Sequence, residues 1–288
     1  MSDSVPAPSS RRRAFAQVNV FSAEPYLGNP VAVVLDADGM AANDMAALAR
    51  WTNLSETTFL LPPTTADADY RLRIFTPGRE LPFAGHPTLG SAHAWLEAGG
   101  LPRASDRIVQ ECGAGLIEIR RDDDVLAFAA PPTVRSGPVD GDLLTRIAGA
   151  LGIDRREILD HQWVDSGPGW IAVRLATAAA VLSLEPDFSG MPEAMLGVLG
   201  DHPAGSPDLF EIRGFAVGAG VAEDPVTGSL NGSVAQWLIG TGKAPASYTA
   251  TQGSRLGRAG VVHIDSTADG TVWVGGTCTT CISGTVLV

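Results

Sequence analysis

The stretch "FAGHPTLGSAHAWL", from Phe83 to Leu96, joins a strand-like segment to a helix and places a histidine directly before a proline. Proline suits the first turn of a helix, because its missing N–H would have no partner there. The residue before a proline is pushed toward an extended conformation. We therefore predict that His86 lies just outside the N-terminus of this helix, where a side chain can serve a site.

A related pattern recurs about half a chain later. The segment "DPVTGSLNGSVAQWL", which starts at Asp224, also contains x-Pro-x-x-Gly-Ser and also runs into a helix that ends in Trp-Leu. Taken alone, either motif is an ordinary helix start, in which Asp224 only caps its helix. Together they predict two pseudo-equivalent halves, each with one polar residue at the start of a helix.

Helix starts of this kind attract anions. The unpaired N–H groups of the first turn and the helix dipole both favour negative charge. We expect these N–H groups near Gly90–Ser91 in the first helix and near Gly228–Ser229 in the second. If the two helix starts face each other, they can bind a small carboxylate between them, with an acid–base group, His86 or Asp224, on each side.

The composition excludes several classes of function. The chain has 288 residues, 45% of them hydrophobic and 18% charged, which is typical of a compact globular protein. A formal net charge of −12 argues against nucleic acid and anionic membranes as partners. No apolar run is long enough to span a bilayer. The first residues lack the apolar core of a signal peptide, so we expect a disordered lead-in over residues 1–13 and a cytoplasmic protein.

The three cysteines do not form a disulfide framework. Cys278 and Cys281 form a CxxC pattern, but it lies in a segment that reads as a strand. Residues three apart on a strand point to opposite faces, so we interpret the pair as two strand residues and not as metal ligands. The sequence has no group of His, Cys and carboxylate residues at ligand spacing, and we expect neither a metal nor an organic cofactor.

The periodicity predicts alternating strands with a few helices. "RLRIFTP" alternates Leu72 and Ile74 with arginines, as a half-buried strand does. A helix is expected over residues 44–52 with Asn43 as its N-cap, and an amphipathic helix over residues 142–152. The pair Pro131–Pro132 is the predicted boundary between two domains, residues 14–130 and residues 131–288. The last strands of residues 131–288 can pair back with the first domain without changing this division.

Five motifs together resemble the phenazine-biosynthesis PhzF-like family: "GNPVAVVL", "NLSETTFLL", "RIFTPGRELPFAGHPTLGSA", "EDPVTGS" and "QGSRLGRAG". The resemblance runs from about Phe15 to the C-terminus in the family's order. It implies an α+β fold similar to diaminopimelate epimerase, with two pseudo-symmetric domains that each curl a β-sheet or barrel around a central helix. It further implies a cofactor-independent isomerase, often a homodimer, with its active site in the cleft between the domains.

The resemblance also implies the site residues. The family's catalytic glutamate matches Glu56, and His86 and Asp224 match its supporting polar pair. The substrate, a small carboxylate-bearing metabolite, is then expected to contact the residues Ser55, Gly85, Gly228 and Ser229. Proton transfer between two carbons needs a carboxyl group that is first base and then acid. We therefore expect partial burial to raise the pKa of Glu56 toward neutral pH.

Other candidates and other functions stay open at this point. Two-cysteine epimerases of the wider fold carry a thiol in each half of the cleft, whereas no cysteine of this chain lies in either motif, so thiol-based racemisation is not expected. Glu80 is interpreted as an ion-pair residue and His93 as a packing residue. A binding protein that has lost its reaction, or a lyase of the same fold, are the alternatives to an isomerase.

Overall fold

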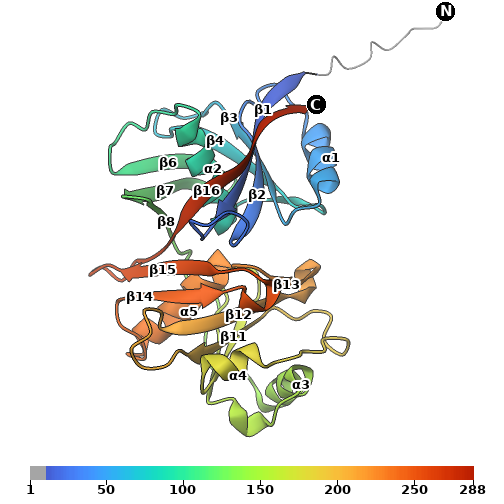
Figure 1. The fold of residues 1–288 in the computed structure, drawn as a ribbon, viewed down its shortest axis with the longest axis vertical. Helices are drawn as coiled ribbons and strands as arrows, with labels where there is room; N and C mark the ends of the chain where they lie inside the picture. Colours follow the sequence, from blue (N-terminus) through green and yellow to red (C-terminus); the bar gives the residue numbers. More distant parts are fainter. Residues whose placement is uncertain (1–10) are drawn as a thin grey trace, which may run out of the picture.

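The computed structural model describes residues 11–288, which form two lobes (Figure 1). One long mixed sheet runs through both lobes in the order β1-β2-β3-β4-β6-β7-β8-β16-β15-β14-β12-β11-β10-β9. The α+β class implied by the family resemblance is confirmed. Among the residues described, no helix has both the length and the hydrophobicity that crossing a membrane would need.

The first lobe is a closed β-barrel. Eight strands form the ring, because β16 pairs with β8 on one side and with β1 on the other. The elements of this lobe are β1 (Arg12–Val20), β2 (Asn29–Val34), α1 (Ala42–Thr52), β3 (Thr57–Leu61), β4 (Tyr70–Phe75), β5 (Glu80–Leu81), α2 (Gly85–Glu97), β6 (Arg107–Cys112), β7 (Gly115–Asp122), β8 (Val125–Ala129) and β16 (Val272–Leu287).

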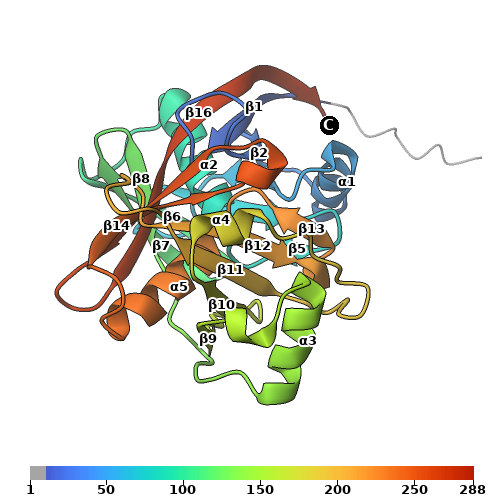
Figure 2. The same ribbon diagram turned by 60° about the horizontal axis from the view of Figure 1, so that its bottom comes forward.

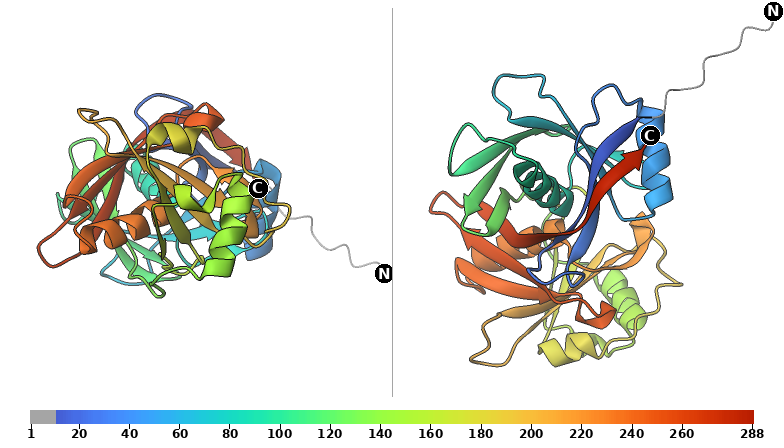
Figure 3. Two further views of the ribbon diagram at one scale, coloured as in Figure 1. Left: turned by 90° about the horizontal axis from the view of Figure 1, so that it is seen from below. Right: turned by 45° about the horizontal axis from the view of Figure 1, so that its top comes forward.

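Helix α2 lies inside this barrel (Figure 3, right). Its first eight residues, Gly85 to Ala92, are all buried. A helix that is buried on all sides needs no face of polar residues, and the sequence has none here. Small residues let the strands come close: a Cβ atom on Gly90 would lie 2.4 Å from the side chain of Val31 in β2. The helix therefore fits the barrel only with glycine at this position.

The second lobe is an open, curled sheet with helices on both faces. Helices α3 and α4 pack on one face of the strands, and α5 packs on the other (Figures 1 and 3). Its elements are α3 (Gly141–Leu151), β9 (Asp160–Trp163), β10 (Ile171–Leu175), α4 (Ala178–Leu182), β11 (Leu196–Asp201), β12 (Phe210–Ala216), β13 (Val221–Asp224), α5 (Gly228–Gly240), β14 (Ser247–Gln252) and β15 (Gly260–Ser266), with 3₁₀ helices η1 (Arg155–Glu157), η2 (Val217–Ala219) and η3 (Ser254–Leu256).

The two lobes share one strand and one core. Strand β16 pairs with β15 at its start and with β1 over the rest of its length, so it runs from the second sheet into the barrel (Figures 1 and 2). Val226 and Ala235 from the second lobe belong to the same buried cluster as Leu89 and Phe128 from the first. This shared apolar burial holds the lobes in one relative position.

The starts of helices α2 and α5 meet at the ring of Phe128, which is fully buried. A Cβ atom on Gly85, the first residue of α2, would lie 2.4 Å from the ring. The same atom on Gly228, the first residue of α5, would lie 3.1 Å from it. The phenyl ring therefore fills the space that two missing side chains leave between the helix starts.

Several element boundaries differ from the sequence-based expectations. Strand β1 begins at Arg12, so the last two residues of the expected lead-in belong to the sheet, and residues 1–10 lie outside the residues described. Helix α1 begins at Ala42 with Ala41 as an N-cap that makes no side-chain hydrogen bond, so Asn43 is not the cap. The helix expected over residues 142–152 is α3, which begins one residue earlier and has Asp140 as its N-cap.

We predict that Gly85→Ala lowers the free energy of unfolding by about 1–3 kcal/mol, the usual cost of overpacking a core. Gly228→Ala should lower it less, because its Cβ atom has more room. Gly141→Ala is the matched control: Gly141 is also the first residue of a helix, but nothing lies within 4 Å of its missing side chain. Urea denaturation of the three variants measures these differences. A Gly85→Ala protein as stable as the wild type would show that Phe128 is free to move aside.

Candidate active site

Glu56 lies in the tight turn between helix α1 and strand β3. The helix ends at Asn53, whose φ of 54° is left-handed, a conformation that asparagine tolerates better than most residues. The chain then reverses and reaches Glu56 directly before β3, next to the parallel strand β2. Ser55 precedes Glu56 in this turn and is partly exposed. The backbone of this turn thus holds the Glu56 carboxyl group at the start of β3, beside β2.

His86 lies within helix α2 and not before it. The helix begins at Gly85 with Ala84 as its N-cap, and the N–H of Thr88 donates to the carbonyl of Ala84. The prediction that His86 sits outside the helix is therefore wrong. Pro87 still falls in the first turn, where it replaces an N–H that would have no helical partner. The imidazole remains at the start of the helix, as a side chain of its first turn.

The side chains of Glu56 and His86 meet without forming a hydrogen bond. Oε2 of Glu56 lies 3.4 Å from Nε2 of His86, and their side chains are only 15% and 8% exposed. Both atoms are buried, and neither has a hydrogen-bond partner among the described residues. Buried polar atoms are nearly always satisfied in native proteins. This unsatisfied pair therefore distinguishes Glu56 and His86 from most other buried polar residues and makes them candidates for a functional role.

Burial sets the protonation state of this pair. It raises the pKa of Glu56 from 4.5 to about 8, and the nearby charge of Asp224 adds to the shift. Burial also lowers the pKa of His86 to about 3, while a backbone hydrogen bond with Pro30 acts in the opposite direction. Near neutral pH the imidazole is therefore neutral, and Glu56 is the group whose protonated and ionised forms are both accessible.

Asp224 comes from the second lobe, as the last residue of β13. Its two carboxylate oxygens accept hydrogen bonds from Asn29 Nδ2 at 3.0 Å and from Thr227 Oγ1 at 2.7 Å. Burial raises the pKa of Asp224 to about 6, and these two hydrogen bonds oppose the shift because they stabilise the ionised form. The second lobe thus places a carboxylate beside Glu56, with a lower pKa than Glu56 has.

Three further residues of this site were not identified from the sequence. Asn29 links the lobes, because its side chain donates both to Asp224 and to the carbonyl of Val226. Thr227 and Gln252 complete the network around Asp224, where the Gln252 amide donates to the Asp224 carbonyl. A signal for Asn29 was available: it is the one polar residue at the start of the apolar run "NPVAVV".

Of the two helix starts that were predicted to bind anions, only that of α5 has the expected residues in its first turn. Gly90 and Ser91 lie in the middle of α2, where their N–H groups are used by the helix, and Ser91 Oγ donates to Thr58 at 2.8 Å. Their assignment to the first turn is wrong. Gly228 and Ser229 are the first two residues of α5, as predicted, and Ser229 Oγ accepts a hydrogen bond from Trp170 Nε1.

The remaining polar candidates have structural partners. The Arg73 guanidinium donates two hydrogen bonds of 2.7 Å to Glu80, which confirms the predicted ion pair. His93 Nε2 lies 3.3 Å from Glu97 one turn further along α2. Cys278 and Cys281 lie in β16 as expected for strand residues. Within residues 11–288, no three His, Cys, Asp or Glu side chains are grouped so that they could hold a metal ion.

The sequence is similar to known proteins over almost its whole length. The family model described as phenazine biosynthesis-like protein matches residues 18–284. "Antisense-enhancing sequence 1" of Schizosaccharomyces pombe is 39% identical over 94% of this chain and 97% of its own. The trans-2,3-dihydro-3-hydroxyanthranilate isomerase of Pseudomonas aeruginosa is 34% identical over 85% of this chain and 87% of its own.

The fold is similar to that of solved structures. A phenazine biosynthesis protein of the PhzF family from Bacillus anthracis superposes with a TM-score of 0.83 over 96% of this chain and 100% of its own, at 22% sequence identity. An identity this low is evidence for the fold alone. The predicted architecture, two pseudo-symmetric domains that each curl a sheet or barrel around a helix, is confirmed by this similarity and by the strand order.

We predict a pH-dependent stability that depends on Glu56. A carboxyl group whose pKa is raised by folding contributes stability that is complete below its unfolded pKa, 4.5, and is lost as the pH rises through about 8. The free energy of unfolding of the wild type should therefore fall, relative to Glu56→Gln, by up to about 1.4 kcal/mol per pH unit in this window. Urea denaturation at a series of pH values measures the difference.

Glu24→Gln is the control for this comparison, because Glu24 is exposed and should leave the pH dependence of the wild type unchanged. A difference between the wild type and Glu56→Gln that stays constant between pH 5 and pH 8 would contradict the raised pKa of Glu56.

Proposed function

Because this chain belongs to the phenazine biosynthesis-like protein family, whose relatives include named isomerases, we propose that it is a cofactor-independent isomerase of a small carboxylate-bearing metabolite. In this proposal Glu56 moves a proton from one carbon to another, and His86 and Asp224 position the substrate and tune Glu56. The observation that carries the proposal is the buried, unsatisfied pair of Glu56 Oε2 and His86 Nε2 beside a second carboxylate.

The proposed reaction needs one group that is first base and then acid. The ionised Glu56 carboxylate takes a proton from a carbon of the substrate. The electron pair of the broken C–H bond moves into the double bonds of the substrate that are conjugated with this carbon. The protonated carboxyl group then returns the proton to a second carbon, so the product is an isomer and no other reactant is used. A pKa of about 8 suits this task, because proton transfer is most efficient when the pKa lies near the operating pH.

The neighbouring groups support both steps. Neutral His86 presents Nε2 without a partner in the described structure, so a substrate hydroxyl or the protonated Glu56 has an acceptor there. Asp224 stays largely ionised near neutral pH, which keeps the pKa of Glu56 high. The free N–H groups of Gly228 and Ser229 at the start of α5 favour a carboxylate or the charge that develops when a carbon loses its proton.

The substrate and the assembly are parts of the proposal. Trans-2,3-dihydro-3-hydroxyanthranilate is the first compound to test, because a relative that is 34% identical carries the name of its isomerase. Ser55, Gly85, Gly228 and Ser229 are the proposed substrate contacts. A homodimer and a cytoplasmic location are likewise proposed, with sedimentation velocity and cell fractionation as their tests.

We predict that Glu56→Gln lowers turnover by roughly two to four orders of magnitude, the usual contribution of a positioned general base. The amide is nearly isosteric, so substrate binding should be largely kept. Asp224→Asn and His86→Gln should lower the rate less, because they act through the substrate and through Glu56. The measurements are the rate at which trans-2,3-dihydro-3-hydroxyanthranilate is converted to its isomer, the incorporation of solvent deuterium into both compounds, and the ligand dissociation constant of each variant.

Glu80→Gln is the control, since Glu80 pairs with Arg73 and should not change the exchange rate. If wild-type protein binds the compound but neither converts it to an isomer nor exchanges deuterium into it, the chain is a binding protein for this ligand and not its isomerase. If elimination products accumulate instead, the chain is a lyase. A Glu56→Gln protein with near-normal turnover would show that another group, first of all Asp224, carries the proton.

A further inference from the structure

The late motif "QGSRLGRAG", residues 252–260, packs against the whole turn 224–227 that carries the site aspartate. Gln252 forms hydrogen bonds with both ends of this turn. A Cβ atom on Gly253 would lie 2.6 Å from the carbonyl oxygen of the second turn residue, and one on Gly260 would lie 2.2 Å from the side chain of the third. The motif therefore needs glycine at both positions to lie this close to the turn.

Gln252, the last residue of β14, is buried and uses its full hydrogen-bonding capacity on this turn and on α5. Its Oε1 accepts from the N–H of Thr227 at 3.0 Å and from Asn231 Nδ2 at 2.8 Å. Its Nε2 donates to the Asp224 carbonyl at 3.0 Å and to Thr227 Oγ1 at 2.9 Å. One backbone N–H and one backbone carbonyl thus determine which way the Gln252 amide is oriented.

This amide sets the direction of the Thr227 hydroxyl. Thr227 Oγ1 accepts from Gln252, so its own hydrogen is directed to its other neighbour, Oδ2 of Asp224, at 2.7 Å. A hydroxyl that accepts one hydrogen bond also donates a stronger one. Gln252 therefore keeps Asp224 Oδ2 as an acceptor, which favours the ionised carboxylate.

Arg258 connects the same motif to the other donor of Asp224. Its Nη1 donates to the carbonyls of Tyr26 and Gly28, at 2.7 and 3.1 Å. These carbonyls belong to the loop directly before Asn29, whose Nδ2 donates to Asp224 Oδ1 at 3.0 Å. Arg258, a residue of the second lobe, therefore holds the loop of the first lobe that presents the Asn29 amide.

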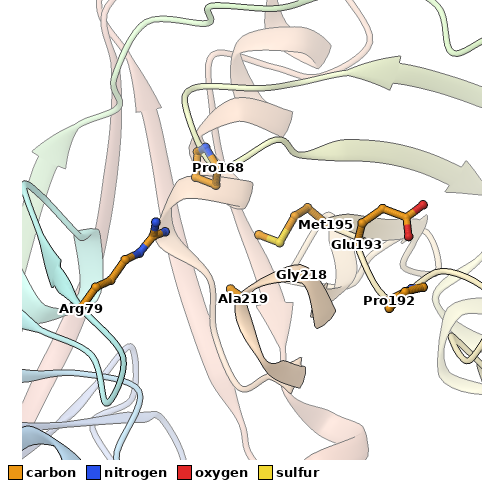
Figure 4. A pocket seen from close by; sticks show the side chains of 7 residues that line it. All are labelled: Arg79, Pro168, Pro192, Glu193, Met195, Gly218 and Ala219. Atoms are coloured by element: carbon orange, nitrogen blue, oxygen red, sulfur yellow. The ribbon is translucent and has the colours of Figure 1, made fainter.

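These contacts are separate from the open groove between the lobes. That groove is lined by Arg79 of the first lobe and by residues of the second lobe such as Met195 (Figure 4). Neither the motif nor the turn 224–227 contributes a residue to its lining. The motif therefore reaches the candidate site through its hydrogen bonds and not as a wall of the groove.

The titratable groups around Asp224 do not change their charge in the pH range where Asp224 titrates. Glu56 faces it from the first lobe, with His86 in contact with Glu56. Near pH 6 Glu56 is protonated and His86 is neutral, because their pKa values are about 8 and about 3. Glu223, which precedes Asp224 in β13, accepts two hydrogen bonds from Arg213 at 2.9 and 2.8 Å. The titration of Asp224 therefore reports on its own donors.

We propose that Gln252 and Arg258 are positioning residues that keep Asp224 ionised by holding its two hydrogen-bond donors in place. Gln252 acts through the Thr227 hydroxyl, and Arg258 acts through the Asn29 amide. This inference rests on the proposed function, because Asp224 is one of the three residues to which that function assigns the reaction. It gives the late motif a role, although no residue of the motif reacts in the proposed mechanism.

The test is ¹³C NMR of the whole protein labelled at the aspartate carboxyl carbon and titrated without a ligand. The Asp224 resonance is identified by its loss in Asp224→Asn, and in the wild type it should titrate near pH 6. Arg258→Met keeps the aliphatic stem and loses the guanidinium. It should raise the pKa of Asp224 by about half a unit to one unit, because the Asn29 donor is held less well. Arg258→Lys, which still has a donor, should shift the pKa less.

Arg255→Met is the matched control. Arg255 belongs to the same motif but bonds to the exposed Glu185, so the variant removes the same charge and touches neither donor of Asp224. It should titrate as the wild type does. In an Asn29→Ala background, Arg258→Met should add no further shift, because the residue through which it acts is gone.

Gln252→Met tests the other donor. It should raise the pKa of Asp224 by a similar amount, and it should add no further shift in a Thr227→Val background. Because Gln252 is buried, circular dichroism first establishes that the variant is folded. If it does not fold, the Arg258 variants decide the inference. A folded Gln252→Met protein with the wild-type pKa at Asp224 would overturn the role of Gln252.

The inference is overturned if Arg258→Met titrates as the wild type does, if Arg255→Met shifts the pKa as much, or if the shift persists in the Asn29→Ala background. These measurements need no substrate, so they are independent of the proposed function. No shift together with isomerisation that depends on Glu56 would overturn the positioning roles and leave the isomerase intact. The expected shifts in a protein that neither isomerises the compound nor exchanges deuterium into it would support the positioning roles and overturn the isomerase.

Discussion

The contact of one phenyl ring with two glycines determines where the functional groups of this protein lie. Phe128 from β8 packs against the first residues of α2 and α5, and both helices can approach the ring only because Gly85 and Gly228 have no side chain. His86 follows the first glycine directly, and Asp224 precedes the second by one short turn. Because the protein interior is close-packed, moving either helix start would move a site residue with it.

Hydrogen bonds give the two buried site carboxylates different pKa values. The same apolar surroundings raise the pKa of both Glu56 and Asp224, but Asp224 has two donors that stabilise its charge, from Asn29 and Thr227, and Glu56 has none among the described residues. The pKa values therefore separate, with Asp224 the lower of the two. When two titratable groups have separate pKa values, one can be ionised while the other is protonated. Here the separation follows from the positions of the Asn29 amide and the Thr227 hydroxyl.

The sequence was sufficient for the fold class, and the structure brings the predicted residues Glu56 and His86 together, but the local geometry of these residues could not be predicted. The repeated motif and the family resemblance predicted the two lobes, and Glu80 was predicted to form an ion pair, although its partner, Arg73, was not identified. The position of His86 was wrong because the rule for residues before proline is statistical, whereas here the helix start is set by tertiary packing at Gly85. The local pattern marks Asn29 as a polar residue in an apolar run, but it does not identify its partner, because Asp224 lies 195 positions further along the chain.

Strand β16 makes the completion of the barrel depend on residues that follow the whole second lobe in the sequence. One edge of β1 and one edge of β8 pair with β16, so both edges stay unpaired until β16 has been made. A nascent chain on the ribosome must therefore carry an open sheet with two free edges while the whole second lobe is made. Open edges of this kind recruit strands from other chains, and pairing over such sequence distances is slow. The first lobe, although its other strands precede the second lobe in the sequence, therefore keeps two open strand edges until the second lobe has been made.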